Sequence, residues 1–174
     1  MEGFSLSVFA SECHVADPER FAGLCGRFFG LLSAANAKMN LTRITSREDY
    51  DVKHVADSLS LTRCFPELAA ARPRVADIGC GAGFPSVVLA AAFPEWEVTA
   101  IDSTQKKIAF VIEAARELGL VNLRPVAGRA VELARRPEFS GKFDVVTARA
   151  VATAEKLCRE GRRMLAPGGR FILY

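Results

Sequence analysis

The chain has 174 residues, of which 50% are hydrophobic and 25% are charged, and its formal net charge is +3. This composition excludes intrinsic disorder, because a chain with so many apolar side chains and so little net charge can bury enough surface to offset its lost conformational entropy. The length predicts one globular domain, with room for a small appendage.

Sequence signals for membranes, secretion and metals are weak. The longest apolar run ends before Pro94, well short of the roughly 20 residues of a membrane helix, so we expect no membrane partner. The first residues lack the basic and apolar stretches of a secretory signal, which predicts a cytoplasmic protein. Five cysteines and two histidines are scattered along the chain. They fit neither a disulfide framework nor a zinc site, so no metal is expected.

Residues 1–72 have the pattern of a helical region. Asp17, followed by a proline, is typical of a helix start, and apolar side chains recur at helical spacing from there to Ala35. A loop is expected over residues 36–45. Residues 46–49 then form a capping-box pattern that opens a second helix.

From residue 73 the chain alternates between short β-favouring runs and helical stretches. Expected strands cover 74–78, 98–101, 123–127, 143–147 and 171–174, and expected helices cover 85–93, 105–118, 130–136 and 152–165. This alternation is typical of βαβ units with right-handed crossovers, which place helices on both faces of a parallel sheet. The predicted fold class is therefore α/β, a doubly wound and mostly parallel sheet in residues 73–174 with helices in residues 1–72.

The most specific motif follows the first expected strand. Residues 77–85 read Asp-Ile-Gly-Cys-Gly-Ala-Gly-Phe-Pro, and Gly79, Gly81 and Gly83 let a ligand approach the bare backbone. The motif lies at the carboxyl end of a strand and opens a helix. This position predicts a nucleotide-type binding site in the crevice of the sheet.

The spacing of this glycine loop separates two ligand classes. It reads G-x-G-x-G, whereas the dinucleotide fingerprint is G-x-G-x-x-G, so the third glycine comes one residue early. Asp77 would repel a pyrophosphate but suits the cationic amino and sulfonium groups of S-adenosylmethionine. Asp102, which ends the second strand, can accept hydrogen bonds from the ribose hydroxyls of either ligand and so does not discriminate between them.

The chain resembles the class I S-adenosylmethionine methyltransferases, which have a Rossmann-like fold, in residues 77–83, Asp102, residues 143–146 and residues 165–169. Further motifs narrow the resemblance to the ribosomal RNA small-subunit methyltransferase G family, also called glucose-inhibited division protein B. They are Asn40-Leu41-Thr42, Lys53-His54 with Asp57-Ser58-Leu59, Gly81-Ala82-Gly83-Phe84-Pro85, Gly128-Arg129-Ala130 and Arg149-Ala150. This resemblance covers the chain from about Phe21 to Tyr174.

The resemblance implies methyl transfer from S-adenosylmethionine to N7 of a guanine in 16S ribosomal RNA, within the bacterial small ribosomal subunit. It also implies that Gly79 and Phe84 line the methionine and ribose side of the cofactor, that Ala130 and Val131 border the adenine, and that Arg149 closes the pocket. The candidate cofactor-binding residues are Asp77, Gly79, Gly81, Gly83, Phe84, Asp102, Ala130, Val131 and Arg149.

Two positions depart from the family pattern. Ser86 stands where another glycine is common, and Val131 stands where an acidic residue often follows the alanine. We expect these departures to alter local packing rather than to abolish binding.

Methylation at guanine N7 needs no general base, because N7 already offers a lone pair and alignment with the activated methyl group can supply most of the acceleration. Residues 147–150 read Thr-Ala-Arg-Ala, which lacks the two prolines typical of exocyclic amine methyltransferases. Cys80 lies in the glycine loop and Cys158 within an expected helix, which disfavours the cysteine nucleophile of a cytosine C5 enzyme.

Arg149 is the candidate residue for orienting the reacting groups. Its guanidinium can bind guanine O6, a phosphate or the carboxylate of the cofactor, while N7 stays free for attack. The alternative is a structural ion pair with Asp102 or Asp144.

The candidate RNA-contacting residues are Asn40, His54, Arg129, Arg162 and Arg163. Residues 135–174 carry nine basic and four acidic side chains. Arginines can bind phosphates bidentately, although each one alone also fits a solvated surface. His54 shares a helical face with Asp57 and Ser58. We expect structural hydrogen bonds there, between the helical region and the sheet, whereas local helix geometry disfavours a hydrolytic triad.

Three functions stay open on the residues alone: an rRNA guanine-N7 methyltransferase, a methyltransferase of another RNA or of a small molecule, and an NAD-binding oxidoreductase or non-catalytic nucleotide-binding module. A class I methyltransferase sheet has seven strands, and the fifth expected strand here runs to Tyr174. We therefore expect that the final strand pair is missing, which would leave an open apolar edge prone to self-association. A full-length protein is expected to be monomeric.

Overall fold

Five parallel strands form the sheet of the computed structural model, which describes residues 4–149 and 161–174. They are β1 (Arg74–Ile78), β2 (Glu97–Asp102), β3 (Leu123–Ala127), β4 (Phe143–Ala148) and β5 (Leu165–Leu173). Their order across the sheet is β3-β2-β1-β4-β5, and every neighbouring pair is parallel. The predicted α/β class is confirmed.

The fifth strand differs from its prediction. The sequence predicts a helix over residues 152–165, of which 152–160 lie outside the described residues. The predicted helix end at residue 165 is wrong, because Arg162–Met164 form a turn of 3-10 helix. The strand β5 begins at Leu165, six residues before the predicted start at residue 171. Pairing with β4 then jumps from Phe143↔Leu165 to Val145↔Arg170. The loop-forming Pro-Gly-Gly segment is thus a bulge within the strand.

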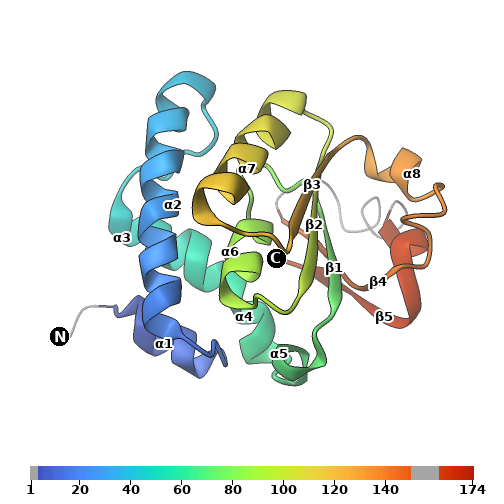
Figure 1. The fold of residues 1–174 in the computed structure, drawn as a ribbon, viewed down its shortest axis with the longest axis horizontal. Coiled ribbons are helices and arrows are strands. Elements are labelled where there is room, and N and C mark those ends of the chain that lie inside the picture. The colour runs from blue at the N-terminus through green and yellow to red at the C-terminus, as the bar shows by residue number, and fades with distance from the viewer. Residues whose placement is uncertain (1–3, 150–160) are drawn as a thin grey trace.

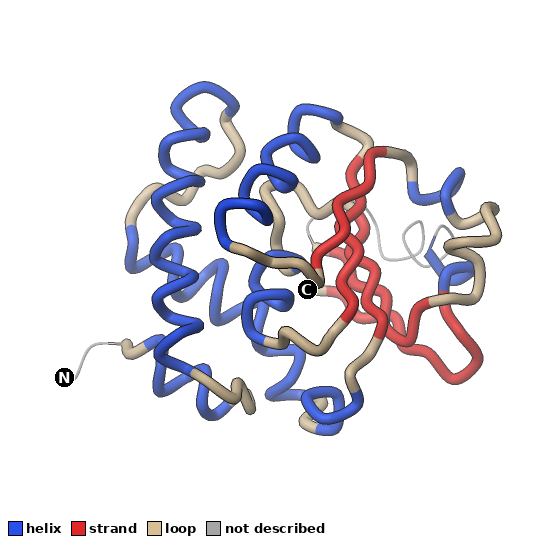
Figure 2. Tube along the Cα trace, viewed as in Figure 1, coloured by secondary structure: helices blue, strands red, loops and turns tan. Residues whose placement is uncertain are grey.

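Among the described residues, seven α-helices lie together on one side of the sheet, and α8 (Ala130–Leu133) lies on the other (Figure 1). The seven are α1 (Leu6–Glu12), α2 (Pro18–Met39), α3 (Arg47–Tyr50), α4 (Asp57–Cys64), α5 (Glu67–Ala71), α6 (Ser86–Ala92) and α7 (Gln105–Leu118). A π-helical segment, Asp51–Ala56, joins α3 to α4. In Figure 2 the strands lie between α8 and the other helices. No helix in the described residues is long and apolar enough to cross a membrane.

The helix starts follow the sequence signals. The Asp17 side chain accepts a hydrogen bond from the amide of Arg20, and Ser46 accepts one from the amide of Asp49. The predicted end of the first helix is wrong, because α2 continues through residues 36–39. Asn40 ends it in a left-handed conformation with φ 51°, which is a common way to terminate a helix.

Two hydrophobic clusters lie on opposite faces of the sheet. Since successive strand side chains alternate between faces, Val75 belongs to the larger cluster and Ala76 to the smaller. The larger cluster also contains Phe28 of α2 and Val111 of α7. The helices of residues 1–72 therefore share a core with the sheet, and the division at residue 72 stays a prediction.

Asn122, which precedes β3, holds the end of α6. Its Nδ2 lies 3.1 Å from each of the carbonyl oxygens of Ala90, Phe93 and Trp96. Carbonyls at the end of a helix lack partners within the helix. One side-chain amide therefore contacts three carbonyls of the segment that connects α6 to β2.

We predict that Asn122→Ala lowers the free energy of unfolding by about 1 to 3 kcal/mol, because it removes the side-chain donor from the Ala90 and Trp96 carbonyls, while the Phe93 carbonyl keeps the Trp96 amide. Urea denaturation measures the change. Val121→Ala is the matched control, since the neighbouring Val121 is 98% exposed and its truncation should cost less than about 0.5 kcal/mol. Equal effects of the two substitutions would contradict the role of Asn122.

Candidate functional site

The glycine loop connects β1 to α6 at the carboxyl edge of the sheet. Gly79, Gly81 and Gly83 have φ values of 73°, 57° and 97°, in the left-handed region that favours glycine. The amides of Gly79 and Cys80 donate to the carbonyl of Ile101 at 2.7 and 3.0 Å. The loop is thereby held against the end of β2.

The surroundings of two of these glycines differ. A side-chain carbon at Gly83 would lie 2.4 Å from Cγ2 of Val87, so packing against α6 excludes one. At Gly81 the nearest heavy atom to such a carbon would be 3.9 Å away. The open face of Gly81 is the kind of space that a ligand at the carboxyl end of a strand requires.

Asp102 connects the second strand to the glycine loop. Its Oδ2 accepts a hydrogen bond from the Gly81 amide at 3.1 Å, and its Oδ1 accepts one from the Thr104 amide at 2.8 Å. The residue is 7% exposed. Because each carboxylate oxygen can accept more than one hydrogen bond, Asp102 keeps capacity for ligand hydroxyls while it fixes the loop.

Asp77 is fully buried beneath the loop. Its Oδ2 accepts from the Ser86 amide at the start of α6 at 3.2 Å, and its Oδ1 accepts from the Thr147 hydroxyl at 3.4 Å. Burial raises the pKa of Asp77 to about 7, although these hydrogen bonds and the charge of Arg149 favour the ionised form. Asp77 is therefore a carboxyl with a raised pKa directly beneath the glycine loop.

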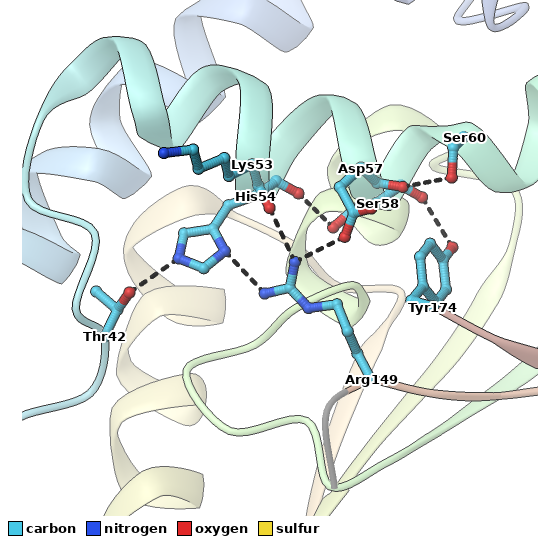
Figure 3. A network of polar contacts seen from close by, with 8 residues as sticks. All are labelled: Thr42, Lys53, His54, Asp57, Ser58, Ser60, Arg149 and Tyr174. Carbon is cyan, nitrogen blue, oxygen red and sulfur yellow. Dashed lines mark hydrogen bonds and ion pairs between the residues drawn. The ribbon is translucent and has the colours of Figure 1, made fainter. Parts of the chain in front are cut away.

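Arg149 follows β4 and reaches the π-helical segment and the start of α4 (Figure 3). Its Nη1 donates to Oδ2 of Asp57 at 3.0 Å and to the carbonyl of Lys53 at 3.2 Å, and its Nη2 donates to Nδ1 of His54 at 2.8 Å. The structural ion pair is therefore made with Asp57, and the two partners suggested by the sequence, Asp102 and Asp144, are wrong.

His54 is 7% exposed and makes the structural contacts predicted between the helices and the sheet. Its ring stacks on Phe84 with centroids 4.2 Å apart and planes at 9°, and its Nε2 lies 2.9 Å from the Thr42 hydroxyl. Burial and the charge of Arg149 lower the pKa of His54 to about 4. The Ser58 hydroxyl donates to the backbone carbonyl of His54 at 2.6 Å, which excludes a hydrolytic triad.

The predicted cofactor residues lie at the carboxyl ends of β1 to β4, which meet at one edge of a parallel sheet. Phe84 is 4% exposed and packs among aromatic rings, so its side chain is more enclosed than a pocket-lining residue would be. Ala130 is 7% exposed and Val131 is 38% exposed at the start of α8. Their proximity to the cofactor stays a prediction.

The predicted RNA-contacting residues do not form one cluster. Asn40 is exposed at the end of α2, and Arg129 is exposed just before α8. Arg162 and Arg163 are exposed beside the start of β4, where the amide of Gly141 donates to the Arg163 carbonyl. They therefore lie at the opposite edge of the sheet from the glycine loop.

Sequence reasoning missed two contributors to this site. Thr42 was part of a family motif without an assigned role, yet it bonds His54 and is itself fixed by two hydrogen bonds with Asn36, each 2.9 Å long. Tyr174 donates from its hydroxyl to the Ser58 carbonyl at 2.9 Å. No local pattern signals either contact. In the described part of the chain, no group of three or more metal-ligating side chains is positioned for a metal ion.

We predict that Asp77→Asn removes a pH dependence from the stability. The pKa of Asp77 in the folded protein lies above its ordinary value of 3.8. The contribution of Asp77 to the free energy of unfolding therefore falls as the pH rises from about 4 to about 7. The variant should therefore gain about 2 to 4 kcal/mol relative to wild type between about pH 4 and pH 8, measured by urea denaturation. His54, whose lowered pKa acts in the opposite direction, is present in both proteins and cancels. A pH-independent difference would refute the assignment.

Comparison with known proteins identifies the family. A family model described as rRNA small subunit methyltransferase G matches residues 24–174. A curated relative from Gloeobacter violaceus, named Ribosomal RNA small subunit methyltransferase G, is 41% identical over 148 residues, which are 85% of this chain and 58% of that protein. The chain spans 58–62% of the length of the first curated relatives that it matches.

Solved structures share the fold. The YcgJ protein from Bacillus subtilis has a TM-score of 0.53 and 30% identity, over 67% of this chain and 49% of that one. A methyltransferase from Geobacter sulfurreducens has a TM-score of 0.60 and 14% identity, over 84% and 72% of the two chains, and this likeness concerns the fold alone. The chain has the class I methyltransferase fold and belongs to the rRNA small subunit methyltransferase G family.

Proposed function

We propose that this protein transfers a methyl group from S-adenosylmethionine to N7 of a guanine in 16S ribosomal RNA, within the small ribosomal subunit. The observation that carries the proposal is the glycine loop with its open face at Gly81, joined through the Gly81 amide to Asp102. Family membership supports the ribosomal RNA substrate.

The residues at the carboxyl edge of the sheet fit the proposed cofactor. Gly81 leaves space for a ligand beside the loop, and Asp102 presents carboxylate oxygens that can accept hydrogen bonds from ribose hydroxyls. Asp77 contributes negative charge beneath the loop when it is ionised, which favours a cationic ligand. The remaining proposed contacts come from Gly79, Gly83, Phe84, Ala130, Val131 and Arg149.

When bound, S-adenosylmethionine supplies an activated methyl group, and guanine N7 supplies the lone pair. The chain then has to align the two and exclude water, which can account for most of the acceleration without a general base. Arg149 donates three hydrogen bonds to the helical region. Its proposed role in orientation is therefore to fix the end of β4 against the π-helical segment.

The proposed RNA contacts fall into three groups. Asn40, at the end of α2, and Arg129, before α8, are exposed. His54 is buried, and both of its ring nitrogens make hydrogen bonds. Arg162 and Arg163 lie at the other edge of the sheet, so they would contact a part of the RNA remote from the target guanine. Arginine binding to phosphates would serve to position the RNA there.

The first test is transfer of labelled methyl from S-adenosylmethionine to small subunits purified from cells that lack the enzyme. We expect label on N7 of one guanine in 16S rRNA. Label on another nucleotide, or no label on the subunits, would favour a methyltransferase of another RNA or of a small molecule. Calorimetry with S-adenosylmethionine and with NADH tests the alternative of an NAD-binding protein. Binding of NADH without binding of S-adenosylmethionine would overturn both methyltransferase functions.

The second test concerns Asp102. We predict that Asp102→Ala weakens binding of S-adenosylhomocysteine by about 1 to 3 kcal/mol, because it removes the charged acceptor and releases the Gly81 amide. Asp102→Asn, which keeps one acceptor oxygen, should lose less. Asp144→Ala is the control, because Asp144 lies at the start of β4 and pairs with Arg74. Affinity that is unchanged in Asp102→Ala would exclude the proposed role.

A further inference from the structure

His54 connects three segments that are far apart in the sequence. It lies in the π-helical segment Asp51–Ala56, its ring stacks on Phe84 of the glycine loop, and it accepts a hydrogen bond from Arg149 after β4. The proposed methyl transfer assigns no task to this contact. The two ring centroids are 4.2 Å apart and the rings are nearly parallel, so a buried histidine directly contacts the loop that would hold a cofactor.

The hydrogen bonds determine which nitrogen of His54 carries the proton. An arginine can only donate, so Nδ1 of His54 must be the acceptor of the bond from Arg149. The proton of the neutral ring is then on Nε2, which donates to the Thr42 hydroxyl at 2.9 Å. Thr42 is held in place by Asn36. The ring is therefore fixed in one tautomer and one orientation.

The charges around His54 also keep the ring neutral. Arg149 presents N–H donors to Nδ1, so a protonated ring would place two cations and two donors face to face. Asp57 is the nearby carboxylate, but it accepts from Arg149, while the Lys53 side chain pairs with Asp49. A neutral aromatic ring thus faces Phe84, with its plane set by hydrogen bonds at both nitrogens.

The position of Phe84 is coupled to the backbone of the loop. Its amide donates to the Cys80 carbonyl at 3.0 Å, and the preceding Gly83 carbonyl accepts from the Val87 amide at 2.7 Å. The ring also contacts Phe28 and Tyr50, with centroids at 5.3 and 6.0 Å. A shift of this ring would therefore move the glycine backbone on which the proposed cofactor site is built.

We propose that His54 is a positioning residue for the glycine loop. It acts through Phe84: a neutral ring, oriented by Arg149 and Thr42, stacks on the phenyl ring and holds the loop in the conformation that binds the cofactor. The proposal deepens the proposed function and rests on it for the identity of the ligand.

Two variants and a control test the stack. His54→Ala removes the ring, and His54→Phe restores a flat ring without its hydrogen bonds. Thr62→Val is the matched control, because Thr62 is also fully buried on the same helical stretch and its hydroxyl donates to the Cys13 carbonyl at 2.9 Å, away from the loop. Thermal unfolding of each variant gives its general loss of stability.

The readouts are S-adenosylhomocysteine affinity by calorimetry and hydrogen exchange of the Phe84 and Val87 amides without ligand. For His54→Ala we expect at least about tenfold weaker binding and at least about tenfold faster exchange at both amides. His54→Phe should recover at least half of each loss on a logarithmic scale. Thr62→Val should change stability but neither readout by more than about twofold.

Several outcomes would overturn the proposal. They are unchanged exchange in His54→Ala, faster exchange without weaker binding, no recovery in His54→Phe, or an equal effect of Thr62→Val at matched stability. If wild type itself does not bind S-adenosylhomocysteine, the proposed function fails, while hydrogen exchange still decides whether His54 holds the loop. If His54→Ala does not fold, His54→Leu replaces it, since leucine fills the space without a planar ring.

Discussion

Two backbone hydrogen bonds, from Gly79 and Cys80 to the carbonyl of Ile101, hold the glycine loop against the end of β2. They require the chain to turn sharply as it leaves β1, which is why the loop adopts positive φ angles. The same turn brings the Gly81 amide to Asp102 and places the Ser86 amide over Asp77. The geometry of the candidate site depends on this one close approach between neighbouring strands.

Burial favours the neutral form of two side chains around the loop, Asp77 and His54. The pKa of Asp77 rises to about 7 and the pKa of His54 falls to about 4, in both cases chiefly because the charged form loses hydration. Arg149 keeps its charge and is paired with Asp57. Around the loop, a carboxyl with a raised pKa and a neutral imidazole ring thus lie near a paired arginine, and Asp102 adds a second carboxyl that bonds the loop directly.

Local signals in the sequence were sufficient for much of the fold. The bounds of β1, β3 and α7 agree with prediction, since the strands are short β-favouring runs and α7 has helical spacing and a clear stop at Gly119, whose φ is 69°. The errors have non-local causes. The strand β5 starts early because Leu165 pairs with Phe143 of the neighbouring strand β4, and the register shift around Gly168 follows from that pairing. Pairing between distant segments overrides local propensity.

The sequence by itself determined the alternation of strands and helices over residues 73–148, the helix caps at Asp17 and Ser46, the glycine loop and the two acidic residues near it, because each is encoded within a few neighbouring residues. Only the tertiary structure decided the partner of Arg149, which lies more than ninety residues along the chain from Asp57 and His54. It also decided the tautomer of His54 and the shifted pKa values of His54 and Asp77. Those properties depend on burial and on which donors face which acceptors, and both arise only when the helical region packs on the sheet.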